Sequence, residues 1–392
     1  MSPAPFARSA DLQRLREEGY LVQIKGNLLV LREVPYLNCN KELKRGTLVS
    51  TLNLAGDVTQ PPDTHVIDWT GDYPCNAEGR PIEALRHRDS SVDLGHGLVA
   101  RHGFSNKPEG GYRDYHHKLT TYVAVISGPA TTQSPGVSAR GNAVPEDEEN
   151  SVFNFVETAS GRAGIGALTE RLAQDVIAII GLGGTGGYVL DIVAKTPAPE
   201  IRIFDPDHFL SHNAFRGPGA ASLEELREMP LKVDHWLSIY SQMRKAIVPH
   251  GVAITDANAH LLDGVTFAFI CIDDGPSKKA VIAKLEAIGA SFIDVGMGLQ
   301  LDDGSLGGIL RVTTSTPAKR DHIHDGRIDF SDDRGQDVYA TNIQVADLNA
   351  LNAIMAVIKW KKIRGFYRDL EREHHCTYTT DGNMLLNGDQ EC

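Results

Sequence analysis

One segment constrains the fold of this chain more than any other, a glycine-rich loop between an apolar strand and a helix. It reads AIIGLGGTGGYVLDIV, and Gly181, Gly183 and Gly186 have the GxGxxG spacing. Residues 176–180 before it predict a buried strand, and residues 187–195 after it predict a helix. The glycines let the backbone approach a phosphate, while the helix N-terminus adds amide donors and partial positive charge. The loop therefore predicts an α/β domain that binds a nucleotide.

The pattern beyond this loop alternates short apolar strands with helices. Strands are predicted at residues 200–204, 251–254, 265–272 and 291–295, and helices at residues 230–246 and 277–288. Such alternation is typical of a parallel sheet covered by helices on both faces. The predicted fold class is therefore α/β, with a doubly wound, Rossmann-like parallel sheet.

The chain of 392 residues is long enough for two domains. Residues 1–127 mix helical and strand patterns, with two apolar runs around Lys25-Gly26-Asn27 that are typical of a hairpin, and predict a smaller α+β domain. Residues 128–150 are rich in Gly, Pro, Ser and Thr and end in an acidic cluster, so we expect a linker there. The α/β domain is then expected over residues 151–392.

Polar and charged residues follow the strands beyond the glycine loop. Asp205 ends the first of these strands, about 20 residues after the loop, where a carboxylate commonly accepts hydrogen bonds from a ribose. Asn213, Arg216 and Lys232 come next. Arginine and lysine neutralise phosphate charge, and a carboxylate at a strand end, such as Asp273, can hold Mg²⁺. This set suits a triphosphate better than the dinucleotide of a dehydrogenase.

In this order the residues resemble the ThiF-type adenylyltransferase family, which includes the ubiquitin-activating enzymes and the activators of sulfur-carrier proteins. The family motif combines a GxGGxG loop, a DxD strand end, an Asn-x-x-Arg, a lysine on the next helix and a CxD strand end. The corresponding residues here are Gly181, Gly183, Gly184 and Gly186, Asp205 and Asp207, Asn213 and Arg216, Lys232, and Cys271 with Asp273. The resemblance covers about residues 160–365. It implies ATP-dependent adenylation of the C-terminal carboxylate of a ubiquitin-like protein.

The resemblance also implies a role for each residue, with ATP and Mg²⁺ as the cofactors. The implied roles are Asp205 for the ribose with Asp207 beside it, Asn213, Arg216 and Lys232 for the phosphates, and Asp273 for the metal. The family carries a further arginine upstream of the loop, for which Arg162 is the first candidate and Arg171 the second. Arg216, Lys232, Asp273 and this upstream arginine are the implied catalytic residues. The activated protein would pass to a conjugating partner in a bacterial ubiquitin-like pathway.

Three other functions stay open at this point. An NAD-dependent oxidoreductase would use the same glycine loop, but it needs a catalytic acid or base beyond the sheet, and the sequence nominates none. Activation of a sulfur-carrier protein would use the same adenylation chemistry. A non-catalytic scaffold would have no need of Arg216, Lys232 and Asp273 together.

The cysteines bear on whether a thioester follows adenylation. None forms a CxxC pair, which argues against a cysteine-based zinc site, and they are Cys39, Cys75, Cys271, Cys376 and Cys392. Residues 291–338, where relatives often carry a nucleophilic cysteine, contain none. Cys376 stands next to His374 and His375, which would lower its pKa if charged, so it is the candidate acyl-accepting thiol. We nevertheless expect direct transfer of the adenylate to a separate partner.

Two further segments and the first domain bear on partners. A long helix is predicted over residues 338–367, and its broad apolar surface requires burial on two sides, inside the domain or in a dimer interface. A homodimer is also what the family resemblance implies. Residues 321–333 predict a flexible acidic loop without a metal, or a cover for the active site. The first domain resembles an uncharacterised domain fused to bacterial ThiF-type proteins, and we expect it to recruit the ubiquitin-like protein or the conjugating partner.

The charge balance limits the partners further. Fifty-one acidic residues against 39 basic ones give a net charge of −12 at pH 7, which repels a polyanion such as nucleic acid. The apolar runs are too short to span a bilayer, and the N-terminus lacks the apolar core of a signal peptide. We therefore expect a cytoplasmic protein that binds neither nucleic acid nor membrane.

Overall fold

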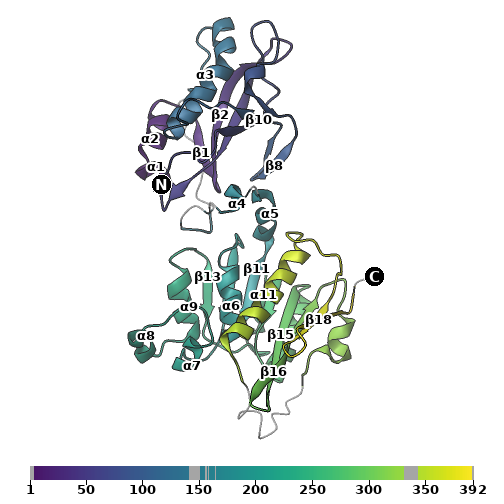
Figure 1. The fold of residues 1–392 in the computed structure, drawn as a ribbon. Coiled ribbons are helices and arrows are strands. Elements are labelled where there is room, and N and C mark those ends of the chain that lie inside the picture. Colours follow the sequence, from purple (N-terminus) through teal and green to yellow (C-terminus); the bar gives the residue numbers. More distant parts are fainter. Residues whose placement is uncertain are drawn as a thin grey trace. The chain divides into compact units, whose positions relative to one another are not determined.

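The computed structural model describes residues 4–140, 151–154, 157, 159–163, 165–330 and 343–390. The chain divides into two compact units, Met1–Glu170 and Arg171–Cys392 (Figure 1). Residues 151–170, predicted to open the second domain, belong to the first unit. Their helix α5 (Gly166–Glu170) packs on strand β8 (Val92–Gly95), where Glu170 accepts a hydrogen bond of 2.7 Å from the backbone amide of His96.

The first unit is built on a six-stranded antiparallel sheet. Its strands, in spatial order, are β1 (Val22–Lys25), β2 (Leu28–Leu37), β3 (Leu43–Thr51), β6 (Val66–Trp69), β10 (His102–Ser105) and β7 (Arg86–Arg88). The predicted hairpin is present, because β1 and β2 pair on either side of Gly26. The remaining elements are β4 (Leu54–Ala55), β5 (Val58–Thr59), β9 (Leu98–Ala100), α1 (Ala4–Arg8), α2 (Ala10–Glu17), η1 (Glu83–Leu85), α3 (Tyr115–Gln133) and α4 (Ala159–Arg162).

Helix α3 extends into the stretch that was predicted to be a linker. Its buried face carries Tyr115, Leu119, Tyr122, Ile126 and Ala130. The spacing of these residues keeps the helix on the sheet past a glycine and a proline, and the hydroxyls of Thr131 and Thr132 donate to carbonyls one turn back. The linker prediction is therefore wrong for residues 128–133, because tertiary packing outweighs a loop-like composition. Residues 141–150 lie outside the described residues.

The second unit is built on an eight-stranded mixed sheet. Five strands are parallel, in the order β13 (Ile247–His250), β12 (Glu200–Phe204), β11 (Val176–Ile180), β14 (Phe267–Ile270) and β15 (Ser291–Asp302). The chain order reverses between β11 and β14, and in open α/β sheets ligands bind outside the carboxyl ends of the strands at this point. Three antiparallel strands follow, β16 (Ser305–Ser315), β17 (His375–Thr379) and β18 (Met384–Gly388). The parallel part confirms the predicted fold class, whereas the antiparallel part was not predicted.

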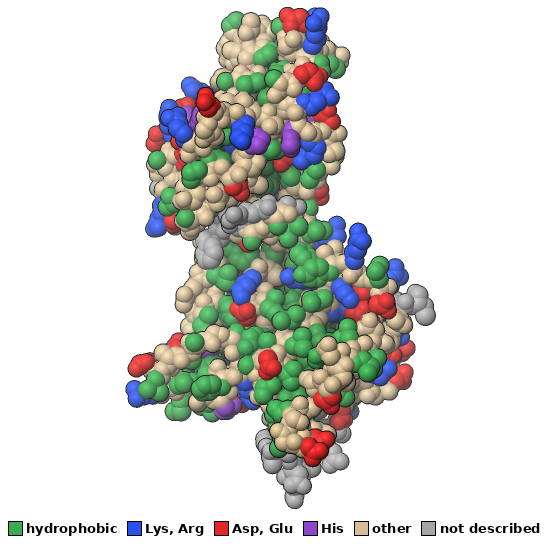
Figure 2. All heavy atoms as spheres, viewed as in Figure 1, with side chains coloured by type: hydrophobic (Ala, Val, Ile, Leu, Met, Phe, Trp, Pro, Cys, Tyr) green, Lys and Arg blue, Asp and Glu red, His purple; other side chains and the backbone are tan. Residues whose placement is uncertain are grey.

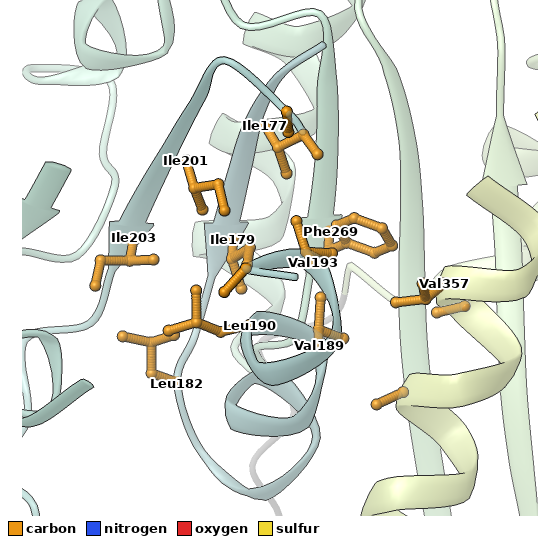
Figure 3. Close-up of a cluster of buried hydrophobic side chains, with 14 of the residues drawn as sticks. Ile177, Ile179, Leu182, Val189, Leu190, Val193, Ile201, Ile203, Phe269 and Val357 are labelled. Carbon is orange, nitrogen blue, oxygen red and sulfur yellow. The ribbon is translucent and has the colours of Figure 1, made fainter. Parts of the chain in front are cut away.

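Helices cover both faces of the parallel strands, as the alternating pattern predicts. Ile177 and Ile179 of β11 face α6 (Gly184–Val193), and Figure 3 shows them packed against Val189, Leu190 and Val193. Ala178 and Ile180 point to the opposite face, in a separate cluster with side chains of α10 (Gly275–Ala287). The other elements are η2 (Arg171–Gln174), α7 (Ser211–Ala214), α8 (Leu223–Glu228), α9 (Lys232–Tyr240), η3 (Ala259–Leu262), η4 (Ile323–Arg327) and α11 (Ala346–Ile363).

Several predicted boundaries are wrong. The strand expected at 251–254 is β13 at Ile247–His250, which contains Pro249 and lies at the edge of the sheet, where proline is tolerated. The helix expected at 338–367 is α11, Ala346–Ile363, and residues 338–342 lie outside the described residues. The described part of the acidic segment includes η4, whose Ile323 is buried, so it is folded rather than loose. No helix within the described ranges is long and apolar enough to cross a membrane.

Candidate functional site

The glycine loop makes a tight turn from β11 into α6 at the carboxyl edge of the sheet. Gly181 has a φ of +89°, and a Cβ there would lie 2.6 Å from the carbonyl oxygen of Cys271. A Cβ on Gly186 would collide with the carbonyl oxygen of Gly181. Both positions require glycine, because the turn is tight and the end of β14 lies against it. Helix α6 begins at Gly184, earlier than predicted.

The two glycines between them differ in what faces them. Gly183 is the N-cap of α6, and a Cβ there would meet no described heavy atom within 4 Å. A Cβ on Gly184 would instead strike the side-chain amide of Asn349, which comes from α11. The open side at Gly183 lets an anion reach the first amides of α6, which is how helix N-termini bind phosphates.

Asp205 follows β12 and is buried beneath this loop. Its Oδ2 accepts a hydrogen bond of 2.7 Å from the amide of Leu182, and its Oδ1 accepts one of 2.9 Å from the amide of Asp207. The amide of Gly181 donates in turn to the carbonyl of Phe204 at 2.8 Å. The end of β12 therefore holds the glycine loop in place through the chain's own groups.

Lys232, the first residue of α9, has its ammonium between two carboxylates. Its Nζ lies 3.2 Å from Oδ1 of Asp205 and 2.8 Å from Oδ2 of Asp207. Asp205 and Lys232 are buried, whereas the side chain of Asp207 is 68% exposed. Asp205 therefore neutralises the charge of Lys232 on its buried side, and a ligand can reach the ammonium beside Asp207.

The segment between β12 and α9 carries Asn213 and Arg216. Asn213 is buried in α7, and its Oδ1 accepts a hydrogen bond of 2.9 Å from the amide of Leu210. Among the described residues, neither the Nδ2 of Asn213 nor the Nε of Arg216 has a hydrogen-bond partner, although both atoms are buried. A buried donor without an acceptor costs free energy. These two donors therefore fit a ligand that is rich in acceptor oxygens.

Electrostatic effects link Arg216 to the two strand-end carboxylates. Burial lowers the pKa of Arg216, and Asp273 and Asp205 act in the opposite direction. Burial also lowers the pKa of His212, helped by the positive charges of Arg216 and Lys232. The structure thus brings the predicted residues together at the carboxyl ends of β11, β12 and β14. His212 belongs to the same cluster and carried no signal in the sequence.

Asp273 and its neighbour Asp274 have different surroundings. Asp273 is exposed, while Asp274 caps α10 by accepting a hydrogen bond of 2.9 Å from the amide of Ser277. Within the described residues, no group of three or more His, Cys, Asp or Glu side chains could hold a metal. This arrangement fits Mg²⁺, which is usually held by one or two carboxylates together with substrate phosphates rather than by a full protein cage. Asp273 is the residue that would hold it.

The two candidate arginines upstream of the loop belong to different units. Arg162 is the last residue of α4, in the first unit, and its side chain lies outside the part of the chain that is described. Arg171 donates from Nη1 to the carbonyl of Gly365 at 2.6 Å, just beyond the end of α11. That contact lies toward the amino end of β11, opposite the glycine loop. In this chain Arg171 therefore lies away from the glycine loop, and the role of an upstream arginine stays a prediction.

The surroundings of Cys376 differ from the sequence expectation. Burial raises the pKa of this thiol, and burial together with nearby arginines lowers the pKa of His375 to about 4. A neutral histidine does not stabilise a thiolate, so the setting of His375 gives no support to activation of Cys376 by this residue. Burial also raises the pKa of Cys271 and Cys75. Cys271 and Cys75 lack the electropositive, accessible setting of a reactive cysteine, whereas Cys376 is half-buried and lines a pocket that also contains Lys359 and Lys362.

A further polar cluster beside the site was missed by sequence reasoning. Asp294 of β15 is fully buried, and it pairs with Lys278 of α10 at 3.1 Å and with Arg311 of β16. It lies level with Ile270, the last residue of β14. The sequence offered no spacing signal, because the three residues come from separate elements, one of them in the unpredicted hairpin.

Comparisons with known proteins give the following matches. Residues 10–158, less than half of the chain, match a family model described as a domain of unknown function (DUF6791). No curated protein matches the chain. A crystal structure of E. coli MccB with MccA-N7isoASN aligns over 59% of this chain and 72% of that chain, with 16% identity and a TM-score of 0.46.

Two further solved structures align similarly. E. coli MccB with ATP covers 60% of this chain and 72% of its own, at 16% identity and a TM-score of 0.45. PaaA covers 57% of this chain and 75% of its own, at 15% identity and a TM-score of 0.42. Likeness at this level carries no function, so the function of the site must follow from the residues that build it.

Proposed function

We propose that the second unit binds ATP with Mg²⁺ and adenylates the C-terminal carboxylate of a ubiquitin-like protein in a bacterial conjugation pathway. The observation that carries the proposal is the convergence of Arg216, Lys232 and Asp273 on one glycine loop. Two cations and an exposed carboxylate beside a helix N-terminus match the charges of a metal-bound triphosphate. The buried Nδ2 of Asn213 and Nε of Arg216, which have no partner in the described part of the chain, point to the same kind of ligand.

The chemistry asks little covalent work of the protein. A carboxylate oxygen attacks the α-phosphorus, the bond to the bridging oxygen of the β-phosphate breaks, and pyrophosphate leaves. Catalysis then depends on alignment and on offsetting the charge of the leaving group. The amides of α6, with Arg216 and Lys232, supply that charge, and Asp205 with Asp207 are proposed to face the ribose. Mg²⁺ on Asp273 would neutralise part of the phosphate charge.

Calorimetric titration of the full chain with Mg²⁺–ATP and with NADH tests the nucleotide. We expect binding of ATP and none of NADH. Pyrophosphate–ATP exchange, with a candidate ubiquitin-like protein ending in glycine, then tests the reaction. Lys232→Ala and Asp273→Ala should abolish exchange, whereas Lys279→Ala, an exposed lysine on α10, should not. Binding of NADH but not of ATP would refute the proposal in favour of an oxidoreductase.

We propose direct transfer from the adenylate to a separate conjugating partner, recruited with the ubiquitin-like protein through the first unit. The raised pKa of Cys376 supports this, because a thiol that stays protonated is a poor acyl acceptor. Cys376→Ala should leave both adenylation and delivery to the partner unchanged. A thioester on the wild-type chain that disappears in Cys376→Ala, with adenylation intact, would contradict direct transfer.

We also propose that the chain is a homodimer through the outer side of α11. Ile354 and Ile358 are exposed on this helix, and hydrophobic side chains gather over it and the adjoining strands (Figure 2). Apolar patches of this kind usually mark interfaces. Light scattering should give twice the mass of one chain, and Ile358→Glu should yield monomers. Leu223→Glu on α8 is the control, at a residue that is 57% exposed against 39% for Ile358.

A further inference from the structure

A buried asparagine of α11 touches both phosphate-binding segments of the site. Asn349 is 1% exposed, on a helix whose inner face is otherwise mainly apolar. Its Oδ1 accepts a hydrogen bond of 2.9 Å from the hydroxyl of Thr185, and its Nδ2 donates to the carbonyl of Arg216 at 3.4 Å. One side-chain amide therefore joins α11, the first turn of α6 and the segment that carries Arg216.

Gly184 completes this contact. The space that a Cβ on residue 184 would need is already filled by the amide of Asn349. Gly184 and Asn349 are thus a matched pair, because any larger residue at 184 would displace the amide from Thr185 and Arg216. Gly184 serves the close approach of α11, whereas its neighbour Gly183 keeps the side that is open to a ligand.

Stability alone gives no reason for an amide at this position. Burying a polar group has a desolvation cost, and replacing both partners of a buried hydrogen bond with apolar groups of the same shape is often close to neutral. What the amide adds is geometry. It fixes the first turn of α6 and the main chain of Arg216 at a set distance from each other. The Nε of Arg216 is buried and has no partner among the residues that the structure describes.

We propose that Asn349 is a positioning residue for the triphosphate, which sets the spacing between the N-terminus of α6 and Arg216. This inference rests on the ATP-binding function proposed above. Its consequence depends on phosphate, because ATP must contact both segments at once, whereas adenosine contacts neither through a phosphate. Loss of Asn349 should therefore weaken the binding of ATP and spare the binding of adenosine.

Titration calorimetry of the full chain with Mg²⁺–ATP and with adenosine tests this. Asn349→Leu should weaken ATP binding about tenfold while adenosine affinity changes less than about twofold. The matched control is Asn352→Leu on the same helix. Asn352 is equally buried, but its Nδ2 donates to the carbonyl of Gly296 at 3.0 Å, away from both segments. It should leave the ratio of the two affinities unchanged.

A second pair of variants covers the case in which Asn349→Leu does not fold. Thr185→Val removes only the hydroxyl and should lower ATP affinity, while Thr185→Ser keeps the donor and should retain more of it. Two results would overturn the inference. One is wild-type ATP affinity in Asn349→Leu. The other is that Asn349→Leu and Asn352→Leu each lose affinity for ATP and for adenosine to the same extent. Failure of the proposed function looks different, because the wild-type chain itself would then not bind Mg²⁺–ATP.

Discussion

The two ends of β11 each have a buried aspartate, and the protein uses them differently. At the amino end, Asp175 accepts hydrogen bonds from Thr266 at 2.8 Å, from Trp360 at 2.9 Å and from Arg364 at 2.7 Å. Trp360 lies in α11 and Arg364 is its C-cap, so the cluster ties the end of that helix to the start of the strand. Within the described ranges, no buried side-chain atom of these four residues lacks a hydrogen-bond partner.

The carboxyl end is open by comparison. Asp205 also holds protein groups, the amide of Leu182 and the ammonium of Lys232. Around it, however, the buried Nδ2 of Asn213 and the buried Nε of Arg216 have no partner within the described ranges. Fully satisfied polar networks make a fold rigid, whereas incompletely satisfied ones gather where a ligand completes them. The comparison predicts that charges at the amino end govern stability and charges at the carboxyl end govern activity.

Arg216→Ala should give the largest effect, and on activity. We expect pyrophosphate exchange to fall on the order of 100- to 1000-fold, because a preorganised cation facing the phosphates is lost. The free energy of unfolding should change little, since the half-buried guanidinium is an incompletely satisfied charge. Pyrophosphate exchange measures the effect on activity, and urea unfolding measures the effect on stability. Arg227→Ala, an exposed arginine on α8, is the control. A variant with normal exchange and a lowered stability would reverse the comparison.

Asp175→Asn should give the opposite result. It leaves the partly buried guanidinium of Arg364 without its carboxylate, and breaking a buried pair of this kind costs about 3 kcal/mol of unfolding free energy. Nucleotide affinity per folded molecule should stay at the wild-type value, because the cluster lies at the other end of the strand. Urea unfolding followed by titration with ATP at low temperature measures both. Loss of affinity in a fully folded variant would show that the two ends are coupled.

Most of the candidate site could be predicted from the sequence, because the patterns that locate it are local. The glycine loop and Asp205 directly follow strands of a parallel sheet, Asp273 comes three residues after another, and the carboxyl ends of such strands share one edge. Lys232 and Asn213 lie on segments that begin at that edge. A strand–loop–helix pattern therefore placed these residues together without any knowledge of long-range contacts.

Features that depend on long-range packing could not be predicted from the sequence. The partners of Asn349, Thr185 and Arg216, are far away from it in the sequence, so no local pattern predicts their contact. The antiparallel strands β16–β18 have no periodic signal that separates them from loops. The pKa of Cys376 is set by burial in β17, and neighbours in the sequence say nothing about burial.

A third buried charge, Lys118 in the first unit, differs from both aspartates because it has neutral hydrogen-bond partners. Lys118 of α3 is fully buried, and its ammonium donates to three neutral oxygens of the described residues, those of Ser50, Thr64 and Val66, at 2.8 to 2.9 Å. Burial lowers its pKa from 10.5 to about 8. Folding therefore releases a proton between these two pH values, and the free energy of unfolding should rise with pH across that window.

The rise is about 2 kcal/mol between pH 8 and pH 9.5, at about 1.4 kcal/mol per pH unit. Urea unfolding of the full chain, compared with Lys118→Met, measures it. The comparison is needed because burial raises the pKa of Tyr115 and Tyr122, whose contribution to stability falls as pH rises above about 10 in both proteins. If the free energy of unfolding had the same pH dependence in both proteins, the pKa of Lys118 would not be lowered by folding.

Ser222→Ala should give the smallest effect on stability, and it tests whether α8 belongs to the functional region at the carboxyl end of the sheet. Ser222 caps α8 in a reciprocal pair with Glu225, with hydrogen bonds of 3.2 and 2.7 Å between side chains and amides. Its loss should cost about 1 kcal/mol locally, visible as faster hydrogen exchange in α8. ATP affinity should barely change, because the main chain of Arg216 is held by Asn213 and Asn349 rather than by α8. A marked loss of affinity would extend the functional region to α8, and the open end of the sheet would then include the whole segment between β12 and α9.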